Sequence, residues 1–320
     1  MSLVINVTTP EGIVLAADSR QSYRNQKGAA RIGSDNASKL FKLNDRIAVA
    51  ATGMAFLPEK GMLKNISKFI EQFKKIEIEK IENISVKETA EKIHEYFKSI
   101  YKVEDQIRAI EQQITNDIAK NGGKILRTDA KKNIVIVEFE DANGKKGVAN
   151  VVLEPLNFMV AGFNSNFDSH EVYTCRIPGG IELKRNSSVD NKEYGASWEG
   201  QNDVVARIVL GFDPRIGNIK FVQEAAEKIG KDQINEQLRN LEYAIQWGTM
   251  TLQDAIDFCV LIIKTTSAIQ RFSDGIKADP GAIPGVGGSI DVVVIRPEEG
   301  FNWVSKKKLS INENCSEINF

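Results

Sequence analysis

Four short β-type segments at the start of the chain constrain its fold more than any other feature. Residues 3–8 and 12–17 are rich in β-branched side chains and flank the turn sequence TPEG, so they predict a β-hairpin. Residues 39–43 and 46–52 predict a second hairpin, and the polar stretch 21–36 between the two predicts a loop. A chain that opens in this way builds a sheet from its first residues, which ties down a terminus that would otherwise fray.

The rest of the chain alternates between blocks of helical and strand patterns. The block 86–120 contains an isoleucine stripe at 107, 110, 114 and 118, which fits either core packing or the seam of a partner helix. Further helices are predicted at 57–73, 203–210, 223–244 and 251–271, and further strands at 134–139, 147–153, 157–163, 171–175, 192–197, 290–295 and 301–304. This order of strands, helices, strands, helices and strand is typical of an α+β fold.

Charge and hydropathy exclude several classes of partner. The 42 basic and 43 acidic residues give a net charge of −1, which gives no electrostatic reason to expect nucleic acid or an anionic membrane. No stretch approaches the roughly 20 apolar residues of a membrane helix. The N-terminus lacks the basic and apolar regions of a signal peptide, so the protein is expected to be cytoplasmic.

The cysteines and histidines predict no metal site, and no cofactor is expected. Cys175, Cys259 and Cys315 are far apart and odd in number, which supports neither a zinc site nor a disulfide framework. The two histidines are His94, expected on an exposed helix face, and His170, expected in a loop. So few histidines give no basis for assembling a Ser-His-Asp triad.

Ser2 is the first candidate for chemistry. Methionine aminopeptidase removes Met1 when the second residue is small, and the chain would then begin with Ser2. An α-amine has an unperturbed pKa of roughly 7.7–8, so part of it is uncharged at neutral pH and accepts the hydroxyl proton, directly or through one water. One residue would then supply both the nucleophile and the general base.

The run VINVTTPEGIVLAADSR followed by SKLFKLNDRIAVAATG resembles the N-terminal half of proteasome β subunits and their bacterial relatives, within the N-terminal nucleophile hydrolase superfamily. Counting back from Asp18 places Ser2 at the family's nucleophile position, where the family usually has threonine. Lys39 falls at the catalytic lysine, with Asp18 as the partner of its charge. Gly53, in Ala-Thr-Gly, falls at the glycine whose N–H forms the oxyanion hole.

The resemblance is looser in the second half of the chain. Residues 193–197 look like a family loop that supplies a serine near the terminal amine, which makes Ser197 the candidate, or Ala196 in its place if the match shifts by one residue. Asp274 is the candidate for a family aspartate that follows the last long helix. Where the family has a serine before the next glycine, this chain has Val286.

The resemblance implies a four-layer αββα sandwich of two antiparallel sheets flanked by helices. Residues 2–320 would form a single domain, with insertions at about 102–150, a helix and a β-hairpin, and at about 214–247, which is helical.

The resemblance further implies hydrolysis of peptide bonds in a peptide or unfolded protein, without a metal or cofactor. Two other interpretations stay open. One is acyl transfer, as in a peptide ligase, or hydrolysis of a non-peptide amide, and the other is a non-catalytic scaffold subunit. Family members stack into rings and some are fed by a separate ATPase, so a homo-oligomer or ring is a further expectation.

Overall fold

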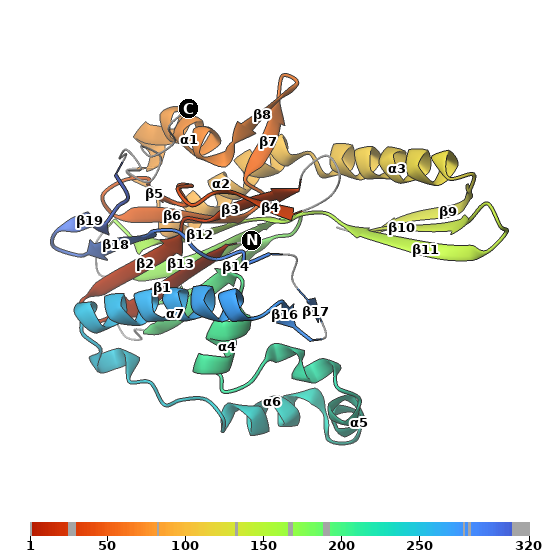
Figure 1. The fold of residues 1–320 in the computed structure, drawn as a ribbon. Coiled ribbons are helices and arrows are strands. Elements are labelled where there is room, and N and C mark those ends of the chain that lie inside the picture. Colours follow the sequence, from red (N-terminus) through yellow and green to blue (C-terminus); the bar gives the residue numbers. More distant parts are fainter. Residues whose placement is uncertain are drawn as a thin grey trace, which may run out of the picture.

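The computed structural model describes residues 2–24, 30–81, 83–131, 134–165, 169–187, 193–277, 279–280 and 283–308. Its centre consists of two five-stranded sheets, and every strand pair in the described residues is antiparallel. The first sheet has the order β15 (Gly195–Gly200), β1 (Leu3–Thr9), β2 (Gly12–Asp18), β18 (Ile290–Arg296) and β19 (Gly300–Ser305). The second has the order β14 (Ile181–Asn186), β13 (His170–Ile177), β12 (Leu156–Phe163), β6 (Ile47–Gly53) and β5 (Leu40–Lys42) (Figure 1).

The N-terminal hairpin is the most buried part of the first sheet. Every residue of β1 and β2 is buried, because both faces of these strands are covered. The polar Asn6 satisfies its amide on the neighbouring strand, donating to the carbonyl of Val14 at 3.1 Å. Between the two five-stranded sheets lies an apolar cluster that includes Val4, Leu15, Leu40, Ala50, Met159 and Val293. This cluster holds the strand that follows Ser2 against β5, which directly follows Lys39, and against β6.

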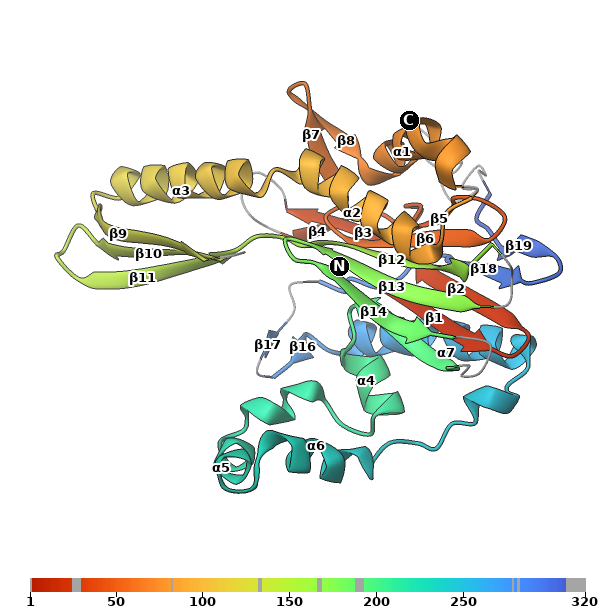
Figure 2. The same cartoon turned by 180° about the vertical axis from the view of Figure 1, so that it is seen from behind.

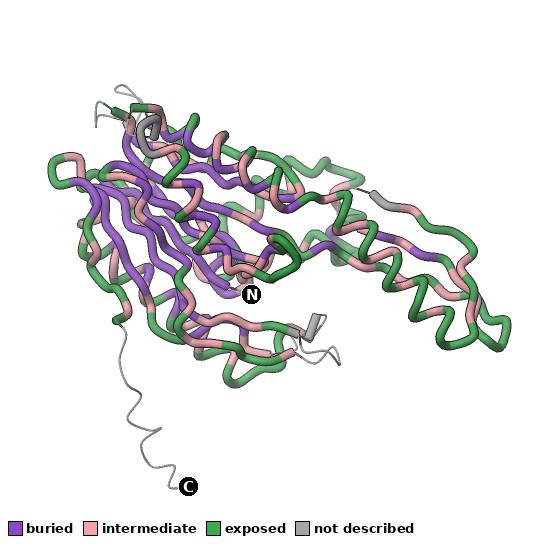
Figure 3. The backbone as a smooth tube through the Cα atoms, turned by 90° about the horizontal axis from the view of Figure 1, so that it is seen from above, coloured by how far each residue is buried: buried purple, intermediate pink, exposed green. Residues whose placement is uncertain are grey.

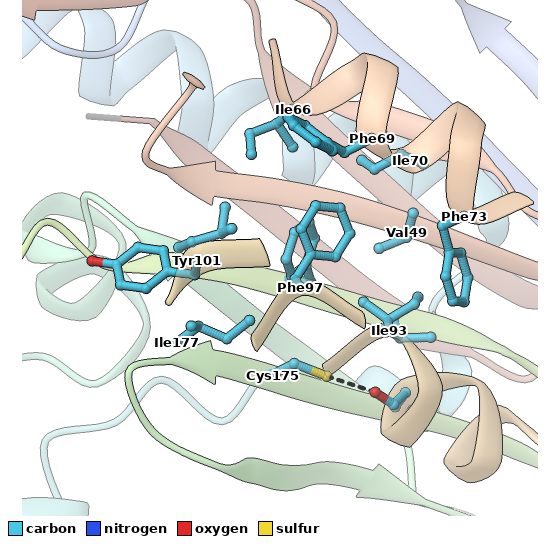
Figure 4. Close-up of a cluster of buried hydrophobic side chains, with 14 of the residues drawn as sticks. Val49, Ile66, Phe69, Ile70, Phe73, Ile93, Phe97, Tyr101, Cys175 and Ile177 are labelled. Carbon is cyan, nitrogen blue, oxygen red and sulfur yellow. Dashed lines mark hydrogen bonds between the residues drawn. The ribbon is translucent and has the colours of Figure 1, made fainter. Parts of the chain in front are cut away.

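Helices cover the outer faces of both sheets. On the second sheet, α1 (Ile66–Ile81) and α2 (Val86–Tyr101) build an aromatic cluster (Figure 4). In this cluster the ring centroids of Phe97 and Phe158 are 4.3 Å apart. On the first sheet, α4 (Asp203–Val209) and α7 (Leu252–Phe272) pack through Val205, Ile262 and other apolar side chains. Figure 1 shows α7 running along the strands of the first sheet.

The expected four-layer sandwich of two sheets flanked by helices is wrong as a description of this chain. The described residues form six sheets and seven α-helices, and several of these elements lie outside the two five-stranded sheets and their covering helices. Three of the sheets are two-stranded: β3 (Gln21–Arg24) with β4 (Ala30–Ser34), β7 (Phe56–Glu59) with β8 (Met62–Asn65), and β16 (Gly275–Ile276) with β17 (Asp279–Pro280). The stretch 21–36, expected to be a loop, therefore contains a hairpin.

A helix and a three-stranded sheet project from the body as an arm. The helix is α3 (Val103–Lys120), and the sheet contains β9 (Lys124–Lys131), β10 (Ile134–Glu140) and β11 (Lys146–Val152) (Figure 2). The isoleucine stripe of α3 packs against the arm's own sheet, through Ile125, Val135 and Val137 among others, and joins the aromatic cluster at the base. Figure 3 shows that the strands of the body are buried, whereas the arm is mostly half-buried or exposed. The expected hairpin at 134–153 is present, but β9 is not among the expected strands.

The segment after α4 contains short helices that extend beyond the first sheet. These are a 3₁₀ turn at Pro214–Asn218, α5 (Lys220–Ile229), α6 (Lys231–Arg239) and a 3₁₀ turn at Trp247–Thr249. Val222 is the buried apolar residue of α5, and in α6 no residue is buried. That this segment and the arm are insertions into one domain stays a prediction.

Two expected helices differ from the structure for backbone reasons. The segment expected to begin a helix at 57 first forms the β7–β8 hairpin, because Lys60 and Gly61 take positive φ angles of 51° and 80° and reverse the chain. The helix expected over 86–120 is broken into α2 and α3 at Lys102, whose φ of 48° is left-handed. The turn sequence at 58–61 contains Pro and Gly, which is the signal that could have located this hairpin.

Truncation of Phe97 to alanine is expected to lower the free energy of unfolding by about 3–5 kcal/mol, because it leaves a cavity in the aromatic cluster. Phe97 is 1% exposed, whereas Phe221 on α5 is 67% exposed, so Phe221→Ala is the matched control and should change stability by under about 1 kcal/mol. Denaturant unfolding measures both, and equal losses would contradict the packing described above.

Candidate active site around Ser2 and Asp18

Ser2 is the first described residue and lies directly before β1. Its side chain is buried, with 5% of the residue exposed. The peptide that joins Ser2 to Leu3 is held at both ends: the Ser2 carbonyl accepts a hydrogen bond from the Gln201 N–H at 2.7 Å, and the Leu3 N–H donates to Oδ1 of Asp18 at 3.0 Å. The position of Ser2 is therefore set by the strands around it.

The Asp18 carboxylate, at the end of β2, collects donors from four parts of the chain. Oδ1 accepts from the Leu3 N–H and, at 2.7 Å, from the Lys39 ammonium. Oδ2 accepts from the N–H groups of Arg20 and Gly287, each at 3.0 Å. Asp18 is 1% exposed, so these bonds replace the water that a buried carboxylate loses.

Lys39 lies just before β5 and forms a buried ion pair with Asp18. Its side chain is 8% exposed, and that of Asp18 is fully buried. Burial lowers the pKa of Lys39 below its ordinary value of 10.5, and the Asp18 carboxylate opposes this shift. The nearby cations Lys307 and Arg20 lower the pKa of Lys39 further. An ammonium in this position donates a proton more readily than a surface lysine.

Ser2, Lys39 and Gly53 line one small cavity of about 40 Å³. A buried water needs roughly 10–15 Å³, so the cavity has room for a few small groups beside the serine. The remaining lining residues are Arg20, Gln21, Ser22, Ala37, Ser38, Ala51, Thr52, Met54, Ala55, Asn65 and Ile66. The structure therefore brings together four of the six predicted residues, since Asp18 holds Lys39 and the N–H that follows Ser2.

Gly53 occupies a position that admits only glycine. Its φ is 84°, and a Cβ atom there would lie 1.9 Å from the carbonyl oxygen of Pro155. The next N–H, of Met54, donates to that same carbonyl at 2.9 Å. The lack of a side chain at Gly53 therefore lets the backbone at Pro155 approach this edge of the cavity closely.

Arg20 lines the same cavity and forms a bidentate ion pair with Asp35. The guanidinium donates to both carboxylate oxygens, at 2.7 and 2.9 Å. The Arg20 hydrogen bonds hold the pKa of Asp35 below its usual range. The side chain of Arg20 also fills the space beside Gly287, where a Cβ would lie 2.6 Å from the guanidinium carbon.

Ser197 and Asp274 do not lie with the other four residues. Ser197 pairs with Asn6 in the antiparallel register of β15 and β1, and Leu3 pairs with Gly200, so Gly200 and Gln201 are the residues beside Ser2. The shifted alternative, Ala196, lies farther still, opposite Val7. Asp274 is exposed after the end of α7 and borders a separate, larger groove with Gly200 and Gln201.

Sequence reasoning missed Gln201 and Gln270, which the structure adds, together with Gly287, to the surroundings of Ser2 and Asp18. The Gln270 side chain donates to that of Gln201 and accepts from the Val286 N–H at 2.9 Å. No local pattern marks a glutamine on an amphipathic helix as a site residue. The glycines at 287 and 288 were the only signal in this region of the sequence.

The two described cysteines and both histidines lie outside this cavity. Cys175 and Cys259 are buried, and burial raises the pKa of both thiols, that of Cys175 to about 12, so neither is a ready nucleophile. Cys315 lies outside the described residues. His170 is buried at the start of β13 rather than in a loop, and His94 on α2 is half-buried, with Nε2 3.1 Å from the Gly179 carbonyl oxygen.

The described residues contain neither a metal-binding cluster nor a membrane-spanning helix. They contain no group of three or more His, Cys, Asp or Glu side chains that could hold a metal ion. None of their helices is both long enough and apolar enough to cross a membrane.

Of three comparisons with known proteins, the one with solved structures gave matches. No protein-family model matches the chain, and no curated protein matches it. Among solved structures, the chain is similar to Anbu, in a Gly-1 mutant from Hyphomicrobium sp. strain MC1, with a TM-score of 0.47 and 10% sequence identity. That similarity covers 100% of this chain and 99% of the Anbu chain. At this level it carries no argument about the family or the activity of this protein.

Replacement of Asp18 by asparagine is expected to lower the free energy of unfolding by about 3–5 kcal/mol, because it leaves the Lys39 charge buried without a partner. The double variant Asp18→Asn, Lys39→Met removes that charge and should recover part of the loss. Denaturant unfolding of the two variants measures the difference. A double variant no more stable than Asp18→Asn alone would contradict the ion-pair explanation.

The lowered pKa of Lys39 also predicts how stability depends on pH. Between that lowered pKa and the ordinary value of 10.5, the unfolded chain binds more protons at this residue than the folded chain. The free energy of unfolding should therefore rise with pH in this window, and more steeply in the wild type than in Lys39→Met. Parallel pH profiles for the two proteins would show that the pKa of Lys39 is not lowered by folding.

Proposed function

We propose that this protein is a proteasome-like N-terminal nucleophile hydrolase that cleaves peptide bonds through Ser2. The observation that supports this proposal above all others is the meeting of Ser2 with the buried Asp18–Lys39 pair at one small cavity. A serine beside a buried lysine whose pKa is lowered has the surroundings of an activated hydroxyl. The matches of Ser2, Asp18, Lys39 and Gly53 to the family's sequence pattern support the same assignment.

In the proposed reaction, removal of Met1 frees the α-amine of Ser2. That amine takes the proton of the Ser2 hydroxyl as Oγ attacks the carbonyl carbon of the scissile peptide bond. The Lys39 charge favours the developing alkoxide, and the N–H of Gly53 donates to the oxyanion of the tetrahedral intermediate. The intermediate collapses as the C–N bond breaks, and the protonated amine gives its proton to the departing nitrogen.

Water completes the proposed cycle. The Ser2 amine, now neutral, takes a proton from a water molecule as the oxygen of that water attacks the carbonyl carbon of the acyl ester. The amine then returns the proton to Oγ as the ester bond breaks. In this proposal Asp18 takes no part in the proton transfers, because its role is to hold Lys39 and the Leu3 N–H in place. Each step uses groups of this chain, and the substrate supplies the acyl carbon and the leaving amine.

A peptide epoxyketone tests the proposal, because it forms a covalent adduct with the hydroxyl and the free amine of one residue. The wild type is expected to lack Met1 by intact mass and to gain one inhibitor mass at Ser2. Ser2→Ala should lose the adduct and at least about 10³-fold of peptide hydrolysis, as expected for a lost nucleophile. Ser2→Thr, which keeps both groups, should retain activity.

Controls make the result specific. Ser99→Ala changes a serine on the outer helix α2, where its hydroxyl donates to the Tyr96 carbonyl, and should leave labelling and turnover unchanged. Addition of a labelled amine during turnover distinguishes hydrolysis from acyl transfer, because only transfer incorporates the label. An active protein that keeps Met1, or Ser2→Ala with wild-type turnover, would reject the proposal.

A further inference from the structure

We infer that Gln270 is a positioning residue for Ser2 and Asp18, acting through a side-chain amide pair with Gln201. The inference rests on the proposed function, since it concerns the same site. Gln270 lies in the last turn of α7, and its one side chain links the two backbone segments that hold the site, 200–201 and 286–287. Neither segment is adjacent in sequence to Ser2 or Asp18.

The first link leads to Ser2. The Gln201 N–H donates to the Ser2 carbonyl at 2.7 Å, while the Leu3 N–H donates to Asp18. Gly200 lies so close that a Cβ there would be 2.0 Å from the same Ser2 carbonyl oxygen. A shift of Gln201 would therefore rotate the peptide that follows Ser2, and with it the hydroxyl and amine carried by that residue.

The second link leads to Asp18. Gln270 Oε1 accepts from the Val286 N–H at 2.9 Å, and the next N–H, of Gly287, donates to Asp18 Oδ2 at 3.0 Å. The Gly287 carbonyl in turn accepts from the Ser19 N–H at 3.0 Å. Val286 stands where the family resemblance leads to the expectation of a serine, and its side chain is fully buried. The polar side chain that contacts the backbone at Val286 is that of Gln270.

An amide is the side-chain group that both links require. Gln270 donates from Nε2 to Gln201 Oε1 and accepts at Oε1 from the Val286 N–H, and a carboxylate or an apolar group cannot do both. The helix that carries Gln270 is fixed against the first sheet by buried Cys259, Ile262 and Ile263. A rigid element with its own packing thus sets the position of both segments, as a precise site requires.

Three variants test this role. Gln270→Leu keeps the approximate shape and removes both links, so the rate of epoxyketone labelling at Ser2 and kcat are expected to fall roughly 10- to 100-fold, with KM nearly unchanged. Gln201→Glu keeps the acceptor oxygen for Gln270 and should retain most of the rate. Gln253→Leu is the matched control on the same helix and should behave as the wild type, because Gln253 is exposed and its side chain donates to Asp257, one turn along α7.

Hydrogen exchange gives a readout besides activity. In Gln270→Leu the N–H groups of Leu3 and Gly287 should exchange faster than in the wild type, while thermal unfolding shows whether the global fold persists. If Gln270→Leu is too unstable to assay, Gln270→Glu replaces it, since it keeps the acceptor for the Val286 N–H and loses the donor to Gln201.

The outcomes separate the two proposals. A wild type that is not labelled at Ser2 rejects the proposed function itself. A labelled wild type with Gln270→Leu reacting at the same rate, or with unchanged exchange at Leu3 and Gly287, overturns the positioning role alone. Equal losses in Gln201→Glu and Gln270→Leu would also overturn it, because the first of these variants preserves the acceptor on which the link depends.

Discussion

The buried carboxylate of Asp18 is the constraint on which the surroundings of Ser2 depend. A buried charge must find partners that replace its lost water, and Asp18 finds them on β1, on the turn after β2, on Lys39 and on Gly287. These donors lie up to 269 positions from Asp18 in the sequence, so the carboxylate is satisfied only when both sheets and the segment before β18 are in place.

Ser2, Asp18, Lys39 and Gly53 could be proposed from the sequence because the family pattern that they match lies within one stretch of the chain. The alternation of apolar residues with turn sequences puts Asp18 at the end of one strand and Lys39 just before another, whereas their roles come from the resemblance. The fold class could not be predicted in the same way. β7 and β8 have only four residues each, and β9 is mostly polar, so these strands escape a search for periodicity. The arm also packs on itself, which no pattern in a single strand reveals.

The second half of the site depended on register, which a single sequence does not encode. A short motif predicts Ser197 as the serine near the terminal amine, but the pairing of β15 with β1 places Ser197 opposite Asn6 and brings Gln201 to Ser2. A strand can contain the expected sequence motif, and its register can still place that motif several residues away from the residue it was expected to contact. Gln270 could not be predicted for a related reason. Its side chain contacts Gln201 and Val286, which lie in segments that only the tertiary fold brings together.

Stability alone does not explain why a lysine and an aspartate lie between the sheets. Apolar residues of similar volume often replace a buried ion pair without loss, and the cluster between the two sheets is otherwise built from Val4, Leu15, Leu40 and similar side chains. The pair occurs where the apolar packing ends and a cavity opens beside Ser2. A charge that costs desolvation energy there, and whose proton is loosened by burial, is what the proposed reaction asks of Lys39, and an apolar pair could not supply it.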